Sequence, residues 1–128
     1  GKLNGTQTIY YEFEDPSDKR VIAAKVTPYK MGVISGDVIE YFDTGAVKSK
    51  VTYVNGKKEG VSVINHPNGK VMIMERYKGG IQHGWQSALD HTGKETGKQY
   101  YRYGKRIEGK ELDEYLKQLK AKGINPNG

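Results

Sequence analysis

Apolar and polar residues alternate along short stretches of the chain, and each stretch ends at a turn that contains glycine. Between residues 47 and 53, Val47, Val51 and Tyr53 fall on one side of an extended chain, and lysine and threonine fall on the other. Alternation with a period of two predicts a half-buried β-strand. Comparable strands are predicted at 37–42, 61–65, 71–77, 85–89 and 95–101. The chain is therefore expected to be a succession of β-hairpins.

The turns recur with a fixed period. Gly36, Gly60 and Gly84 lie 24 residues apart, and a tyrosine follows each of them after 17 residues. Such a period over three successive units indicates a repeat architecture. Asn55-Gly56 and Asn68-Gly69 are strong signals for two-residue hairpin turns, in which glycine adopts a positive φ angle without strain. The predicted turn glycines are Gly45, Gly56, Gly69, Gly80, Gly93 and Gly104.

The first unit departs from the period. Tyr29 and Gly32 arrive seven residues late, and the extra residues form a charged stretch around 12–20 that is followed by a strand predicted at 21–26. Insertions in repeat proteins map to loops. Residues 1–5 have the composition of a turn between two units. A long loop is therefore predicted in the first hairpin.

The repeat ends at Gly109, and residues 110–122 predict a helix with one apolar face formed by Leu112, Tyr115, Leu116 and Leu119. Gly123 is suited to a left-handed helix stop, which would bring Ile124 onto Leu119. The terminal unit of a repeat array needs a cover for its exposed end. The predicted layout is an array over 1–109, with units at about 5–35, 36–59, 60–83 and 84–108, a capping helix at 110–123 and a tail at 124–128.

The predicted strand at 71–77 is apolar on both sides, because Met72 and Met74 alternate with Val71 and Ile73. Such a strand needs a covering on each face. The terminal helix is the first candidate for the second covering, and a protein partner is the next.

Composition and charge limit the classes of function. Hydrophobic residues make up 35% of the 128-residue chain, and ten tyrosines supply most of its aromatic side chains. The net charge is +6, of which residues 65–128 carry +5, which could favour an acidic protein, an anionic membrane or nucleic acid. Acidic residues interleaved with the basic ones make mere solubility the simpler interpretation.

Cysteine is absent, and no apolar run is long enough to cross a bilayer. No signal peptide is visible, which favours a cytoplasmic location. The chain begins with Gly1 rather than methionine, so a trimmed or processed N-terminus is expected.

The sequence contains no phosphate-binding loop, dinucleotide fingerprint or nucleophile elbow. His66, His91 and Asp90 lack the spacing of a zinc site, and acidic residues of the inserted loop lack the pattern of a calcium loop. These loop carboxylates, which we interpret as solvated charges, are Glu12, Glu14, Asp15 and Asp18. No catalytic residue, metal site or cofactor is predicted.

Four motifs carry a resemblance to a known family. They are NGKKEG at 55–60, NGK at 68–70, GIQHGW at 80–85 and YGK at 103–105. Together they resemble MORN repeats, in the variant found in bacterial proteins similar to the YwqK-like antitoxin-component group. The resemblance implies hairpins stacked in a row into an elongated, twisted, single-layer antiparallel sheet. Only Trp85 supplies the aromatic residue that follows the first glycine of the family's unit.

The recurring aromatic residues, with arginines nearby, suit either the core of a thin sheet or a contact surface. We expect a non-catalytic protein-interaction module that acts as a scaffold, an inhibitor or an antitoxin-like binder. The alternatives are a basic-surface binder of anionic lipid or nucleic acid, and an accessory repeat domain of a larger enzyme. A homodimer could form through the N-terminal sheet edge. The candidate partner-binding residues are Tyr41, Tyr53, Met72, Met74, Tyr77, Trp85, Tyr101, Arg102 and Arg106.

Overall fold

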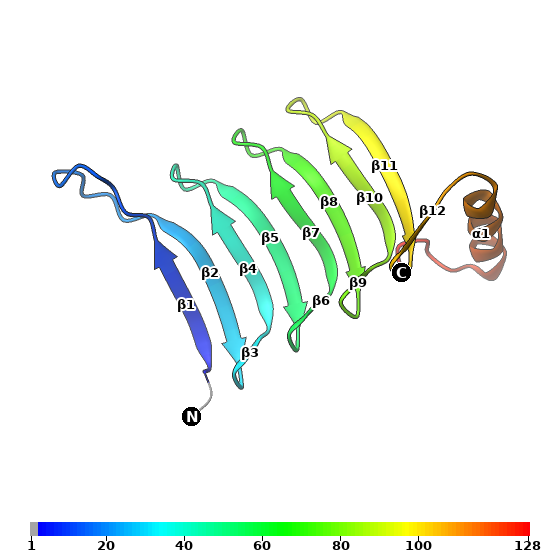
Figure 1. Cartoon of the computed structure of the whole chain (residues 1–128), viewed down its shortest axis with the longest axis horizontal. Coiled ribbons are helices and arrows are strands. Elements are labelled where there is room, and N and C mark those ends of the chain that lie inside the picture. The colour runs from blue at the N-terminus through cyan, green and yellow to red at the C-terminus, as the bar shows by residue number, and fades with distance from the viewer. Residues whose placement is uncertain (1–2) are drawn as a thin grey trace.

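A computed structural model describes residues 3–128, which form one open antiparallel sheet of twelve strands followed by a helix (Figure 1). The mainly β, elongated array of hairpins with a C-terminal helix that the sequence predicted is confirmed. The predicted turn at 1–5 lies partly outside the described residues. The elements are β1 (Gly5–Tyr10), β2 (Ala23–Lys30), β3 (Val33–Ile34), β4 (Gly36–Tyr41), β5 (Val47–Val54), β6 (Lys57–Lys58), β7 (Gly60–Asn65), β8 (Val71–Lys78), β9 (Ile81–Gln82), β10 (Gly84–Leu89), β11 (Glu95–Arg102), β12 (Lys105–Ile107) and α1 (Gly109–Lys122).

Each unit contributes one long hairpin, such as β4–β5, and one short strand that turns back on it, such as β6. The short strand and the next long strand pair with the same neighbour but are separated by an irregular residue, as Glu59 separates β6 from β7. The long hairpins therefore follow one another in chain order, and each lies beside the next (Figure 1).

The tight turns between units are two-residue turns with positive φ at both central residues. At Asn55-Gly56 the φ angles are 49° and 84°, which identifies the mirror-image turn that matches strand twist. The amide of Gly56 donates a hydrogen bond of 2.8 Å to the carbonyl of Ile34 in the preceding unit. The amide of Gly80 donates in the same way to Lys58, at 3.0 Å. These glycines therefore link successive units as well as making the turns.

The turn at Asn68-Gly69 has a different form from the one that the dipeptide suggested. The amide of His66 donates to the carbonyl of Lys70, and the amide of Gly69 donates back to His66. Only Gly69 has a positive φ angle in this turn, and the strand register shifts after Ile64. The prediction of a two-residue turn here is wrong, because the loop holds three residues and a bulge.

The first hairpin contains the long loop that its irregular period predicted. Its second strand, however, begins at Ala23 and runs to Lys30, whereas the sequence placed it at 21–26. Arg20 pairs with Asp18 at 2.7 Å and stacks on Phe13, which shapes the loop locally. Within residues 3–128 no strand pairs with the outer edge of β1, which contains no charged residue. Pairing of two copies at this edge stays a prediction.

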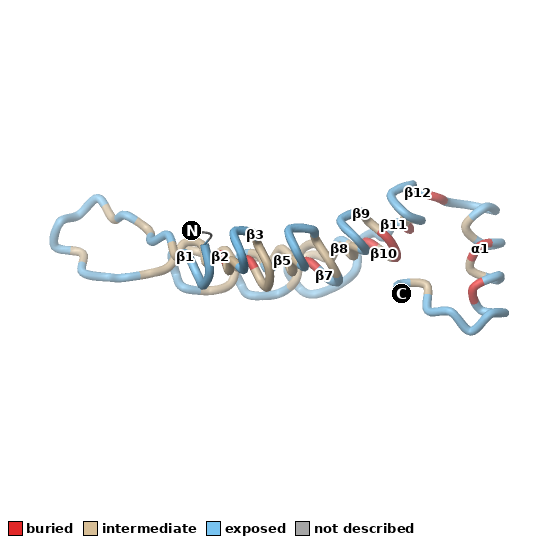
Figure 2. Tube along the Cα trace, turned by 90° about the horizontal axis from the view of Figure 1, so that it is seen from below, coloured by how far each residue is buried: buried red, intermediate tan, exposed pale blue. Residues whose placement is uncertain are grey.

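Helix α1 covers the last unit, as expected. Gly123 ends it in the left-handed conformation with φ of 68°, and the amide of Ile124 donates to the carbonyl of Leu119. The predicted helix stop is confirmed. The apolar core lies between the helix and the sheet and consists of Tyr100, Ile107, Tyr115 and Leu119, with Trp85, Leu112 and Leu116 packed against them. Figure 2 shows buried residues gathered mainly from β10 to α1.

The tail after α1 returns to the sheet. The hydroxyl of Tyr100 donates to the carbonyl of Pro126 at 2.6 Å, and the amide of Trp85 donates to Oδ1 of Asn127 at 2.9 Å. No local pattern in the chain predicts this contact. The tail therefore fastens the helix to β10 and β11.

Candidate functional site

The strand register assigns side chains to two faces of the sheet, because residues directly opposite each other in a ladder point to the same side. Tyr53 is paired with Gly36, Tyr77 with Gly60, and Tyr101 with Gly84. We call this side the tyrosine face. Trp85 is paired with Tyr100, one residue along from the Gly84 pair, and therefore belongs to the opposite side. This second side carries α1, and we call it the helix face.

A row of four half-buried tyrosines crosses the tyrosine face, one from each unit. They are Tyr29, Tyr53, Tyr77 and Tyr101, on β2, β5, β8 and β11. The short strands place one further side chain opposite each tyrosine, and these are Ile34, Lys58, Gln82 and Arg106. The ammonium of Lys58 lies 4.8 Å from the centre of the Tyr77 ring. The row is thus continuous from the first unit to the last.

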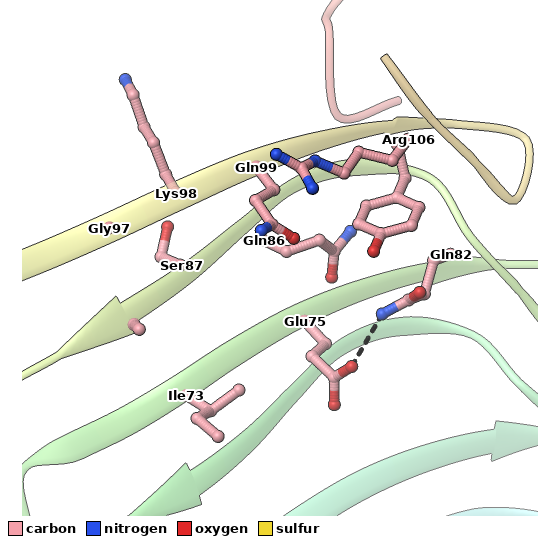
Figure 3. Close-up of a pocket in the computed structure, with 11 residues that line it drawn as sticks. Ile73, Glu75, Gln82, Gln86, Ser87, Gly97, Lys98, Gln99 and Arg106 are labelled. Carbon is pink, nitrogen blue, oxygen red and sulfur yellow. Dashed lines mark hydrogen bonds between the residues drawn. The ribbon is translucent and has the colours of Figure 1, made fainter. Parts of the chain in front are cut away.

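The tyrosine face is hollowed between the third and fourth units. The hollow has a volume of about 500 Å³ and lies across β8, β10 and β11. Figure 3 shows Gln86, Gln99 and Arg106 gathered on one side of it and Glu75 with Gln82 on the other. The lining residues are Ile73, Glu75, Gln82, Gln86, Ser87, Ala88, Gly97, Lys98, Gln99, Tyr101 and Arg106.

Some polar side chains of the hollow are hydrogen-bonded within the protein, and others are available to a ligand. Gln86 is used by the fold, since its oxygen accepts from the amide of Arg76 and its nitrogen donates to two backbone carbonyls. Glu75 accepts through one oxygen from Gln82 at 2.8 Å and from the Tyr77 hydroxyl at 3.2 Å. The side-chain amide of Gln99 is exposed, and it makes no hydrogen bond within residues 3–128. Gln99 is therefore free to donate to a ligand and to accept from it.

The Tyr77 phenol is held in its protonated form. Burial, together with the Glu75 carboxylate beside it, raises the pKa of Tyr77 to about 12. At neutral pH this hydroxyl is a hydrogen-bond donor, and it is committed to Glu75. Tyr77 therefore holds Glu75 in place, and in the lining of the hollow the side chain of Gln99 and the ring of Tyr101 are suited to contact a ligand.

The residues that the sequence proposed for partner binding do not share one face. Tyr53, Tyr77, Tyr101 and Arg106 belong to the tyrosine face. Tyr41 ends β4 at a register shift. The others, which lie on the helix face, are Met72, Met74, Trp85 and Arg102.

The helix face is covered at one end. Arg102 lies over the ring of Tyr115, 4.3 Å from its centre, and so is part of the helix contact. The expectation that α1 covers Met72 and Met74 is wrong, because the helix packs on Trp85 and Tyr100 from the next unit. Both methionines are half-buried within the sheet itself.

Sequence reasoning missed the glutamines and Glu75. Their signal is present in the chain, because hairpin pairing places Glu75 opposite Ser62 and Gln99 opposite Gln86 on the tyrosine face. Finding them requires the register, which the repeat period alone does not supply. His66 and His91, considered for a metal, serve the stacking of turns instead, as His66 contacts the carbonyl of Leu89 and the carbonyl of His91 accepts from Asn68.

His83 joins the last two units beneath the tight turn. It is 3% exposed, its Nδ1 accepts from the amide of Tyr103 at 3.0 Å, and its ring stacks on that tyrosine at 4.1 Å. Burial, with Lys78 and Arg102 nearby, lowers the pKa of this imidazole below its ordinary 6.5. The ring is therefore packed in its neutral form.

We expect the free energy of unfolding to fall as the pH is lowered from 7.5 to 5. The pKa of His83 is lower in the folded chain than in the unfolded chain, so the unfolded chain binds more protons between the two values. The stabilisation is complete above pH 6.5 and is lost as the pH falls through that value toward the lower, folded pKa. Urea unfolding at pH 7.5, 6 and 5 measures it. A His83→Gln variant should show a smaller decrease, and equal decreases would contradict the assignment.

Among residues 3–128 no group of three histidine and acidic side chains is placed to hold a metal ion. In the same described part of the chain, no helix is both long and apolar enough to span a membrane. Comparison with protein-family models, curated proteins and solved structures finds no match for this chain.

Proposed function

We propose that this chain is a non-catalytic interaction module that binds a protein partner along its tyrosine face. The observation that carries the proposal is the hollow of about 500 Å³ shared by two units, with Tyr101, Gln99 and Arg106 on its wall. Aromatic rings and arginine are the residues that most often dominate binding energy in protein interfaces. A scaffold, an inhibitor and an antitoxin-like neutraliser would all use such a surface.

The hairpin array supports binding because the surface exists before the partner arrives. Tyrosine has few rotatable bonds, and the ammonium of Lys58 lies 4.8 Å from the centre of the Tyr77 ring. Binding to a preformed surface avoids much of the entropy lost when loops are ordered. The amide of Gln99 and the guanidinium of Arg106 then supply directional hydrogen bonds, and Arg106 also bonds Glu108 at 2.8 Å.

Two other functions make different predictions. A binder of anionic lipid or nucleic acid would lose affinity steeply with added salt, because phosphate binding releases counterions. An accessory domain of a larger enzyme would bind a segment of that enzyme. The protein-partner proposal predicts weak salt dependence and contacts that centre on the tyrosine face.

Photo-cross-linking at position 99 tests the proposal. A photoreactive amino acid at Gln99 should capture a specific protein from the native host, whereas the same group at Lys50, on the helix face and half-exposed, should not. The captured protein, once purified, should bind a Tyr101→Ala variant at least about 10-fold more weakly, as expected when an interface aromatic is lost.

Tyr10→Ala is the matched control, because Tyr10 is also a tyrosine but is 55% exposed at the end of β1. Its affinity for the purified partner should equal that of the wild type. Cross-links of equal yield at positions 99 and 50, or equal affinity of the Tyr101→Ala variant, would contradict a partner site on the tyrosine face.

A further inference from the structure

The tyrosine row has a regular spacing that restricts which ligand can follow it. Each tyrosine is separated from the next by one intervening strand, as Tyr53 on β5 and Tyr77 on β8 are separated by β7. Neighbouring strands lie about 4.8 Å apart, so successive rings are about 9.6 Å apart along the array. A ligand that lies across the strands therefore meets a tyrosine ring once in every interval of this length.

Glycine forms part of the floor of each space between two rings of the row. Gly36, Gly60 and Gly84 are the ladder partners of Tyr53, Tyr77 and Tyr101, and they put no side chain on the tyrosine face. The remaining residue in each space is the one opposite the preceding tyrosine, such as Lys58 between Tyr53 and Tyr77. Each space between two rings therefore holds one further side chain, and in one of them the ammonium of Lys58 lies against the ring of Tyr77.

The spacing fits a polyproline II helix better than the other regular conformations. That helix repeats every three residues with a rise of about 9.3 Å per turn, so it drifts only about 1 Å from the row over its three intervals. An α-helix returns to the same side after seven residues, about 10.5 Å, and drifts by about 3 Å. An extended strand turns successive third residues to opposite sides and cannot present one face to every ring.

Hydrogen-bonding chemistry favours the same ligand. A proline-rich segment has carbonyl acceptors along its length and few N–H donors. The tyrosine row supplies donors beside its rings, namely the ammonium of Lys58, the guanidinium of Arg106 and the amide of Gln99. One carboxylate oxygen of Glu75 already accepts from Tyr77 and Gln82. The row thus offers mainly hydrogen-bond donors, which a proline-rich backbone lacks.

We propose that the tyrosine face recognises a proline-rich segment of its partner in the polyproline II conformation, with one residue in every three packed against a ring. Four rings at this spacing span about ten residues of such a segment. This inference rests on the proposed function, since it names the kind of partner segment that the same face binds.

Oligoproline peptides of 4, 7, 10 and 13 residues test the spacing directly by calorimetric titration of the full chain. Affinity should rise at each step up to ten residues and change little from ten to thirteen, because each further turn reaches one more ring until the row ends. A ten-residue peptide of D-proline, which forms the mirror-image helix, should bind at least 10-fold more weakly than its L-proline counterpart. Absence of L-proline binding at millimolar concentration, or equal affinity for the two hands, would overturn the inference.

Variants locate the peptide on the row. Tyr53→Ala and Tyr77→Ala should each weaken binding of the ten-residue peptide at least fivefold, while Tyr10→Ala, outside the row, should leave it unchanged. Because truncating a half-buried ring could disturb folding, Lys58→Met provides a second test that removes a hydrogen-bond donor between two rings of the row. It should weaken binding about threefold with an unaltered circular dichroism spectrum, and unchanged affinity in all three variants would place the peptide elsewhere.

The outcome is separable from that of the proposed function. Capture of a partner by the cross-linker at position 99, without oligoproline binding, would retain the tyrosine face as a protein site and reject the proline-rich ligand. Absence of both results would reject the two proposals together.

Discussion

Replacing Tyr100 with alanine is expected to detach helix α1 from the sheet and to lower the free energy of unfolding by about 3–5 kcal/mol. Tyr100 is completely buried and contacts the rings of Trp85 and Tyr115, with centroid distances of 5.2 and 5.8 Å. Its removal would leave a cavity in the centre of the one large apolar cluster of the described chain. A helix of 14 residues has little stability without a packing partner.

Hydrogen exchange and chemical denaturation together measure this effect. In the Tyr100→Ala variant, amides of α1 should exchange at nearly the rate of an unfolded chain, while those of β4 and β5 keep most of their protection, because units of a repeat array contact only their neighbours. Tyr100→Phe retains the ring and loses only the hydrogen bond to Pro126, so about 1 kcal/mol is expected. Tyr10→Ala controls for loss of an exposed tyrosine. A Tyr100→Ala variant as stable as this control would contradict the central position of the ring.

Much of the architecture is predictable because its determinants are local. A hairpin depends on alternation within a few residues and on a turn residue with positive φ, as at Asn55-Gly56, and both are visible in the sequence. The helix stop at Gly123 is equally local. The 24-residue period then extends one unit to the whole array, which is why the order and number of hairpins follow from the chain alone.

The features that the sequence did not predict depend on contacts between distant residues. The tail contact of Asn127 with Trp85 joins residues 42 positions apart, and no local pattern marks it. The covering of Met72 and Met74 was misplaced for a related reason, since helical periodicity shows that α1 has an apolar face and does not say which unit it meets. The turn at Asn68-Gly69 has the same backbone hydrogen bonds as the turns at Thr44-Gly45 and Thr92-Gly93, so its form is shared by the units and is not set by the Asn-Gly pair.

The candidate site was predicted in part. Recurrence identified Tyr53, Tyr77 and Tyr101, because a residue at the same place in every unit must lie in one row of the array. The candidate partner-binding residues lie on two different faces of the sheet. Their division between the faces follows from the strand register and its bulges, which the repeat period does not reveal. Gln99 was missed because glutamine occupies this place in one unit only. Val51 and Glu75 occupy the equivalent places in the two preceding units.

Replacing Gly84 with alanine is expected to lower the free energy of unfolding by about 2–4 kcal/mol and to release the C-terminal tail. Gly84 has a φ of 102°, where a side chain strains the backbone. A Cβ atom there would lie 2.8 Å from Oδ1 and 3.1 Å from Cα of Asn127. Because the second atom belongs to the backbone, a rotation of the Asn127 side chain cannot relieve the contact, and the tail must move.

Gly60→Ala separates the two causes, because Gly60 is the equivalent residue one unit earlier, with φ of 78° and no atom within 4 Å of the added Cβ. The free energy of unfolding of Gly60→Ala should fall only by the cost of backbone strain, about 1–2 kcal/mol, and the tail should stay in place. Displacement of the tail also breaks the bond from the Trp85 amide to Asn127, so exchange at that amide should accelerate in Gly84→Ala and not in Gly60→Ala. The losses from Gly84→Ala and Asn127→Ala should then be less than additive, since both act through one contact. Strict additivity, with equal losses for the two glycine variants, would show that backbone strain alone requires glycine at this position and that the tail makes no contribution.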